Sequence, residues 1–148
     1  MWLHRSIIAL STASLLLLNG PFSAIADEYE DAVKSAYSAW DAAFNNKDAD
    51  GVAAFYADAY LLPPTHKVIE GAKGVAEFFS GLFKGGATGH KLEMIEADGN
   101  GKIVFGAAKW SASGKDDKGQ PATFTGIATH VFEKQSDGKL KLKLHTFN

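Results

Sequence analysis

Residues 33–44 read VKSAYSAWDAAF, and this stretch decides how the chain folds. Its large apolar side chains recur three or four positions apart, from Val33 through Tyr37 and Trp40 to Phe44, with charged residues between them. That period is typical of one face of an α-helix. The spacing therefore predicts a long helix whose aromatic face packs against the rest of the domain.

Two shorter helices are expected after this first one, which should begin near Asp27. Asp48 or Asp50 can cap the second helix, because a short carboxylate side chain accepts hydrogen bonds from free amides at a helix start. The second helix would place four residues on its inner side: Val52, Phe55, Tyr56 and Ala59. The third would follow a turn at Glu70-Gly71 and bury another four: Val75, Phe78, Phe79 and Leu82.

Beyond His90 the apolar residues alternate with polar ones, which is the period of β-strands. We expect a brief strand at Thr65–Ile69 and four long strands at Lys91–Ala97, Lys102–Ser113, Pro121–Lys134 and Lys139–Phe147. Turn sequences rich in Asp, Asn and Gly separate the long strands. Helices followed by an antiparallel meander indicate an α+β domain.

The N-terminus has the three parts of a secretory signal peptide. Arg5 precedes an apolar run from Ile7 to Leu18, and Ala24-Ile25-Ala26 forms a cleavage site of small residues. The run is shorter than the about 18 to 20 apolar residues that a membrane helix needs. We expect cleavage after Ala26, which would divide the chain into a signal peptide, residues 1–26, and one domain, residues 27–148.

The amino-acid composition limits the cellular compartments and the classes of binding partner that we expect. The chain contains no cysteine, which excludes disulfides and thiolate chemistry and suits a bacterial periplasmic or secreted protein. A formal net charge of −2 gives no electrostatic footprint for nucleic acid or, after signal cleavage, for a membrane. Phosphate-binding glycine motifs are missing, and we expect no cofactor.

Several short motifs occur in an order that resembles a known superfamily. They are AYSAWDAAF at 36–44, GVAAFYAD at 51–58, LLPP at 61–64, IEG at 69–71, VAEFF at 75–79 and HTFN at 145–148. This order resembles the nuclear transport factor 2-like superfamily. The later hairpins and the closing motif are similar to its SnoaL-like and ketosteroid-isomerase-like branch.

The resemblance implies a cystatin-like fold, in which a cone-shaped, curved antiparallel sheet wraps around the long N-terminal helix and two shorter helices complete it. It also implies a pocket at the open end of the cone and a homodimer formed through the sheet. Members of the superfamily include isomerases, cyclases, dehydratases, hydrolases and binding modules. The fold alone therefore decides little about activity.

The catalytic set of ketosteroid isomerases is missing from this chain. Those enzymes use a carboxylate base together with a tyrosine and a protonated aspartic acid that stabilise the enolate. Matching this sequence to that pattern places Trp40 at the tyrosine, Pro63 near the base and Ala128 at the second acid. Steroid-type isomerisation is therefore not expected.

Two histidines are the candidate catalytic residues, His130 and His145. Strand parity places His130 on one face with Phe124, Gly126, Ala128 and Phe132. The family resemblance implies that Lys143, His145 and Phe147 line the pocket, although the leucines alternating with them would otherwise suggest the opposite face. If His130 paired with Lys143, the two histidines would be diagonal neighbours. One of them would then accept a proton or donate a hydrogen bond to a ligand; packed, purely structural histidines are the alternative.

The expected ligand is a small apolar molecule, because the sequence is rich in aromatic residues near the predicted pocket. The pocket candidates are Trp40, Phe44, Tyr60, Phe78, Trp110 and Phe147. Trp110 could instead lie on the outer face of the sheet and be buried in a dimer. None of the histidines stands in the spacing of a zinc motif, so no metal site is predicted.

Two functions remain open on these observations. The first is an exported small-molecule-binding protein with an apolar pocket, and as a candidate enzyme it would transfer protons on a hydrophobic carbonyl compound. The alternative is a non-catalytic, dimeric protein-interaction module. An enzyme needs a titratable group aimed into a concave apolar site, whereas a module needs an exposed apolar patch.

Overall fold

The structure, a computed structural model, describes residues 21–148, so most of the predicted signal peptide lies outside the described residues. The elements in chain order are α1 (Pro21–Asn45), α2 (Ala49–Ala53), β1 (Tyr56–Leu62), β2 (Ile69–Glu70), α3 (Gly71–Lys84), β3 (Thr88–Gly99), β4 (Ile103–Lys115), β5 (Pro121–Lys134) and β6 (Leu140–Phe147). Within the described residues, no helix is both long and apolar enough to cross a membrane.

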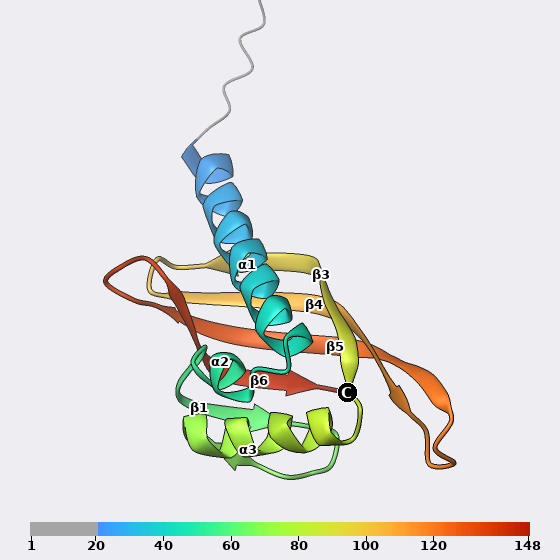
Figure 1. Ribbon diagram of the computed structural model, residues 1–148. Coiled ribbons are helices and arrows are strands. Elements are labelled where there is room, and N and C mark those ends of the chain that lie inside the picture. The colour runs from blue at the N-terminus through green and yellow to red at the C-terminus, as the bar shows by residue number, and fades with distance from the viewer. Residues whose placement is uncertain (1–20) are drawn as a thin grey trace, which may run out of the picture.

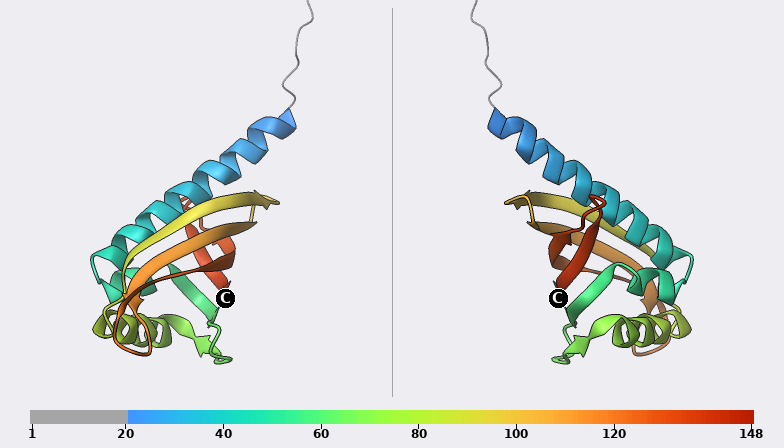
Figure 2. Two further views of the ribbon diagram at one scale, coloured as in Figure 1. Left: turned by 90° about the vertical axis from the view of Figure 1, so that its right-hand side faces the viewer. Right: turned by 90° about the vertical axis from the view of Figure 1, so that its left-hand side faces the viewer.

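The six strands form one curved, unclosed sheet in the order β2-β1-β6-β5-β4-β3. Helix α1 crosses the concave side of the sheet, and α3 lies beside β1 at the opposite end (Figures 1 and 2). Neighbouring strands are antiparallel except β1 and β6, which run parallel. The α+β class and the curved sheet are therefore as predicted, while the purely antiparallel sheet is corrected by this one pair.

Helix α1 follows the predicted stripe. Val33 and Phe44 are fully buried, and Tyr37 and Trp40 lie between them in the core. The helix begins at Pro21 instead of near Asp27, and proline is well suited to the first turn of a helix, where its missing amide has no partner to lose.

The second helix is shorter than predicted, and a strand takes the place of its second half. The Asp48 carboxylate caps α2 by accepting a hydrogen bond from the Gly51 amide at 2.8 Å, as one of the two expected caps. Tyr56 and Ala59 are buried three residues apart because the register of β1 against β6 shifts between Tyr56 and Tyr60, where Asp58 adopts a left-handed backbone conformation with φ of 45°. The resulting spacing imitates a helix, although the segment is a strand.

The β1–β2 connection also differs from the prediction. Strand β2 is only Ile69–Glu70 and pairs with Leu61 and Tyr60 of β1, so the expected strand from Thr65 does not form. Pro63 and Pro64 lack amide donors and stop strand pairing at this point. The segment therefore becomes a loop, and it lies over the open end of the sheet.

Candidate functional site

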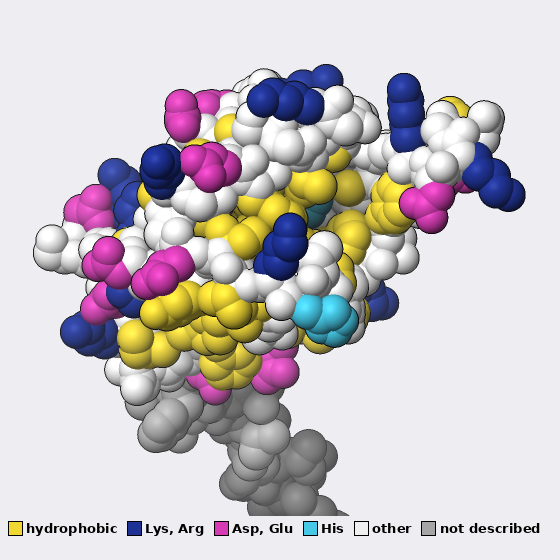
Figure 3. All heavy atoms as spheres, turned by 90° about the horizontal axis from the view of Figure 1, so that it is seen from below, with side chains coloured by type: hydrophobic (Ala, Val, Ile, Leu, Met, Phe, Trp, Pro, Cys, Tyr) yellow, Lys and Arg dark blue, Asp and Glu magenta, His cyan; other side chains and the backbone are white. Residues whose placement is uncertain are grey.

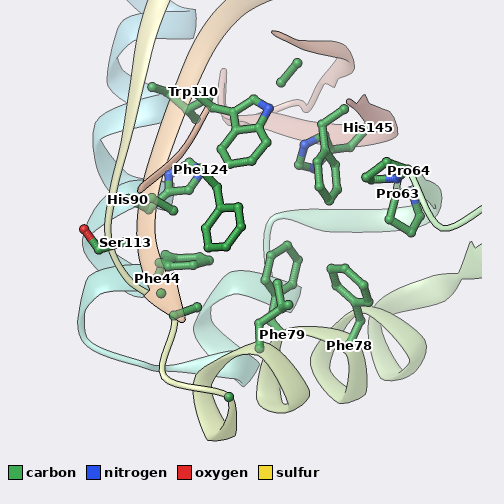
Figure 4. Close-up of a pocket in the computed structure, with 18 of the residues that line it drawn as sticks. Phe44, Pro63, Pro64, Phe78, Phe79, His90, Trp110, Ser113, Phe124 and His145 are labelled. Carbon is green, nitrogen blue, oxygen red and sulfur yellow. The ribbon is translucent and has the colours of Figure 1, made fainter. Parts of the chain in front are cut away.

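The open end of the curved sheet holds a cavity of about 430 Å³ between α1, α3 and strands β3 to β6. This volume lies in the range of small-molecule sites. Hydrophobic side chains gather around the hollow on the lower face (Figure 3), and aromatic rings surround a central space in the close-up (Figure 4). The cavity is therefore apolar, and few polar groups reach it.

Five of the six predicted pocket residues line this cavity: Trp40, Phe44, Phe78, Trp110 and Phe147. Tyr60 does not, because its side chain points away on β1 and its hydroxyl donates a hydrogen bond to Glu70 at 3.4 Å. Trp110 lies on the cavity side of the sheet and not on the outer face, and its indole N–H donates to the backbone oxygen of Asn148 at 3.2 Å.

A bulge in β6 decides which side chains of that strand face inward. Phe132 pairs with Leu142 and Val131 with Leu144, so Lys143 is an extra residue. Leu142 and His145 are consequently both buried, although they stand three positions apart. Lys143 does not line the cavity, which corrects the expectation drawn from the family resemblance.

His130 and His145 face each other directly across the β5–β6 pair, instead of diagonally as expected. Their ring centroids are 4.4 Å apart. Each ring is held by a tyrosine: the Tyr37 hydroxyl lies 2.8 Å from His130 Nδ1, and the Tyr56 hydroxyl lies 2.7 Å from His145 Nδ1. Only His145 lines the large cavity, whereas His130 lines a small hollow behind Trp40.

Burial keeps both of these histidines neutral. It lowers the pKa of His130 to about 3, and the Gly106 backbone offsets only part of that effect. Burial likewise holds the pKa of His145 well below its ordinary value, and nearby His130 lowers it further. A neutral imidazole whose pKa lies far below 7 is a weak base, so neither residue suits the role of general base at neutral pH.

A third histidine, His90, has the arrangement that a general base requires. Asp41 Oδ1 lies 2.7 Å from His90 Nδ1, and Asp41 Oδ2 accepts the Leu92 amide at 2.9 Å. The Asn45 side chain makes two further hydrogen bonds to the His90 backbone. Because the carboxylate engages Nδ1, the other ring nitrogen, Nε2, remains for chemistry, and the ring lines the cavity.

Aromatic rings surround His90 on several sides. Its ring centroid lies 4.7 Å from Phe44, 4.8 Å from Trp40 and 6.2 Å from Trp110, and the Trp110 ring is nearly parallel to it. Figure 4 shows His90 and His145 on two sides of the central space. Aromatic packing of this kind fixes the orientation of the ring.

Asp41 and His90 are functional residues that were not predicted from the sequence. Asp41 directly follows the cavity residue Trp40, and His90 stands where the third strand begins, so both signals were present in the sequence. Their meeting depends on how α1 crosses β3, and the separation of 49 positions gives no local clue to it. Within the described residues, no group of three or more acidic or histidine side chains could hold a metal ion.

Gly126 allows the Trp110 wall of the cavity to form. A methyl group at this position would collide with the Asn148 backbone oxygen and would lie 2.6 Å from Trp110 Nε1. We expect Gly126→Ala to lower the free energy of unfolding by about 1 to 3 kcal/mol. Urea unfolding followed by tryptophan fluorescence measures this free energy. Gly81→Ala is the control, because the space around Gly81 is open. Equal urea midpoints in Gly126→Ala and Gly81→Ala would contradict the predicted collision.

Comparison with known proteins identifies the family. The SnoaL-like domain matches residues 37–142. Comparison with curated proteins finds no significant match.

Solved structures share the fold at low sequence identity. A ketosteroid isomerase-like protein from Erwinia carotovora atroseptica has a TM-score of 0.69 at 18% identity, covering 79% of this chain and 92% of its own. A nuclear transport factor 2-like protein with a cystatin-like fold from Novosphingobium aromaticivorans has a TM-score of 0.68 at 11% identity, covering 88% and 90%. A candidate dehydratase of the nuclear transport factor 2-like family from Streptomyces avermitilis has a TM-score of 0.66 at 17% identity, covering 82% and 96%. Since the domain match extends over most of the chain, this protein belongs to the SnoaL-like family and has the cystatin-like fold of nuclear transport factor 2 relatives.

Proposed function

We propose that this chain is an exported protein that binds a small apolar carbonyl compound and catalyses proton transfer on it. The observation that carries the proposal is the His90–Asp41 pair at the wall of an apolar cavity of about 430 Å³. A cavity of this kind with few polar groups is the usual form of a small-molecule site. The structures that share the fold include a ketosteroid isomerase-like protein and a candidate dehydratase, and proton transfer is the kind of chemistry that these names describe.

The proposed step begins at His90. Its Nε2 removes a proton from the carbon next to the carbonyl group; the electron pair of that C–H bond forms the C=C bond of the enolate, and the π pair of the C=O bond moves onto the oxygen. Asp41 holds Nδ1 and stabilises the imidazolium that results. The same nitrogen then returns a proton to carbon, and in D2O it returns a deuteron after its N–H has exchanged with solvent, so no other reactant is consumed.

The positions that serve catalysis in ketosteroid isomerases offer no acid or base here. Trp40, Pro63 and Ala128 all line the cavity, and none carries a carboxylate or a phenol. A carboxylate still contributes, but only through His90. The proposed chemistry therefore uses a histidine base where those enzymes use a carboxylate.

Deuterium exchange of 2-tetralone in D2O tests this proposal. This apolar ketone fits the class of ligand proposed and has acidic hydrogens next to its carbonyl. The protein is expected to exchange them faster than an equal concentration of free imidazole, measured by 1H NMR. A rate equal to that of imidazole would contradict the proposed function.

Export is part of the proposal and rests on the sequence alone, since the apolar run from Ile7 to Leu18 lies outside the described residues. The full chain is expected to be cleaved after Ala26 and recovered from the periplasm or the medium of a bacterial host. Intact mass measurement of the exported product identifies the new N-terminus. Recovery of only the uncleaved chain in the cytoplasm would contradict export.

We also propose that the chain forms a homodimer through the outer face of its sheet. Phe105 and Ile127 point to this face on β4 and β5, and they are 39% and 42% exposed. Exposed apolar residues gathered on one face are typical of an interface, and the alternative function, an interaction module, would use the same surface.

Phe105→Asp tests the dimer. A carboxylate in the middle of an apolar interface is expected to raise the dimer dissociation constant at least tenfold, because its charge would be desolvated without a partner. Analytical ultracentrifugation measures the constant. Val68→Asp, at an exposed residue away from this face, is the matched control, and equal constants for the two variants would contradict this interface.

A further inference from the structure

We infer that His145 is held as its Nε2–H tautomer by Tyr56 and offers that N–H to the carbonyl or enolate oxygen of the ligand. This inference rests on the proposed function and adds to it the group that receives the oxygen. It also gives Tyr56, which does not line the cavity, a positioning role.

The first step is that Tyr56 and His145 are both uncharged. The His145 side chain is only 5% exposed, and Tyr56 is equally buried. Burial raises the pKa of the Tyr56 phenol above its usual range, so the hydroxyl keeps its hydrogen. A neutral imidazole carries one hydrogen, on either Nδ1 or Nε2, and the partner of Nδ1 determines which.

The second step is the direction of the 2.7 Å hydrogen bond between the Tyr56 hydroxyl and His145 Nδ1. Within the described residues, this is the only hydrogen bond that the Tyr56 hydroxyl makes. A hydroxyl carries one hydrogen, and a buried hydrogen of this kind needs an acceptor. If Nδ1 donated, the Tyr56 hydrogen would have no acceptor, so Tyr56 donates to Nδ1.

The third step concerns the hydrogen-bond donor that His145 offers to the ligand. With Nδ1 accepting, the hydrogen of His145 lies on Nε2, and the His145 ring lines the cavity. A donor at an apolar wall favours a ligand that brings an acceptor, because a ligand without one leaves the donor unpaired. A fixed, neutral imidazole donor can stabilise the negative oxygen that forms when a neighbouring carbon loses its proton.

Trp40 connects the two histidines. Its ring centroid is 4.8 Å from that of His90 and 6.0 Å from that of His145. A ligand lying against Trp40 can therefore present its carbonyl oxygen to His145 and its C–H group to His90. The two histidines would then have opposite roles, one as donor to oxygen and one as base.

The chain offers a matched control behind this site. Tyr37 and His130 repeat the tyrosine–histidine hydrogen bond at 2.8 Å, but His130 lines only the small hollow away from the ligand cavity. Tyr37→Phe and Tyr56→Phe remove the same group from equally buried positions. Only Tyr56→Phe should affect the ligand.

Two measurements test the inference. Long-range 15N–1H NMR of the imidazole rings should show His145 as the Nε2–H tautomer in the wild type and a mixture of tautomers in Tyr56→Phe. In binding titrations, the wild type and Tyr37→Phe should prefer 2-tetralone over tetralin, its analogue without the oxygen, by about tenfold. Tyr56→Phe and His145→Phe should lose most of that preference.

The outcomes separate this inference from the proposed function. A hydrogen on Nδ1 of His145, or equal preference in Tyr37→Phe and Tyr56→Phe, would overturn the inference even if the protein catalyses exchange. Absence of exchange with the Nε2–H tautomer and the ketone preference intact would contradict the proposed function and support the role of His145 in binding.

Discussion

His90→Gln is expected to slow the exchange of 2-tetralone by about 100-fold to 10,000-fold, with little change in its affinity. Glutamine retains a polar group of similar reach but cannot accept a proton at neutral pH. A positioned general base contributes about this much to a proton transfer. The ring it replaces packs between Trp40 and Trp110, so circular dichroism should accompany the rate measurement to show that the fold is intact.

Asp41→Asn tests whether the carboxylate acts through His90. The amide cannot stabilise a positive charge on the ring and can hold the wrong tautomer, and this kind of change costs up to about 10,000-fold in a serine protease triad. The exchange rate should fall, whereas the ketone preference set by His145 should stay. His66→Gln, at an exposed residue, is the control. Equal rates in His90→Gln, Asp41→Asn and His66→Gln would exclude the proposed base.

Acid should destabilise the protein steeply below pH 6.5, because His130 and His145 are buried in their neutral forms. Above this pH both residues are neutral in the folded and unfolded states, so they do not change the free energy of unfolding. Below this pH the histidines of the unfolded chain bind protons, whereas those of the folded state do not. For His130 this difference persists until the pH nears its folded pKa of about 3. The free energy of unfolding should fall by about 2 kcal/mol for each histidine between pH 8 and pH 5.

His130→Asn separates this effect from general acid sensitivity. The asparagine amide can replace Nδ1 as the partner of the Tyr37 hydroxyl, but it does not titrate. Urea unfolding from pH 8 to pH 5 should show about half the wild-type pH dependence in this variant, whatever its stability at pH 8, while His66→Asn should keep the full dependence. An unchanged slope in His130→Asn would show that His130 is not held neutral.

The sequence predicted those parts of the fold whose apolar spacing is regular. Helix α1 and the hairpin strands β3 to β6 follow helical or alternating patterns over most of their length, with bulges in β3 and β6. Strand β1 was missed because the left-handed Asp58 makes Tyr56 and Ala59 inward-facing at helical spacing. Its parallel pairing with β6 is a long-range contact that no local pattern indicates.

The candidate site was predicted only where side-chain type was sufficient. An aromatic stripe on a helix facing a curved sheet indicates a pocket, and Trp40 lies in its wall. The division of roles among the histidines depends on partners distant in the chain: Asp41 for His90 and Tyr56 for His145. The bulge at Lys143, which sets the register of His145, has no sequence signal of its own.

Intermolecular NOEs between 2-tetralone and the protein test most directly whether the cavity at the open end of the sheet is the ligand site. In the wild type, we expect NOEs from the ketone to the rings of Trp40 and Phe124, both of which line the cavity. In Ala112→Trp, which places a large side chain at a position that lines the cavity, these NOEs and the exchange activity should disappear together. NOEs to the outer-face residue Phe105 instead, or undiminished binding in Ala112→Trp, would show that the ligand does not bind in this cavity.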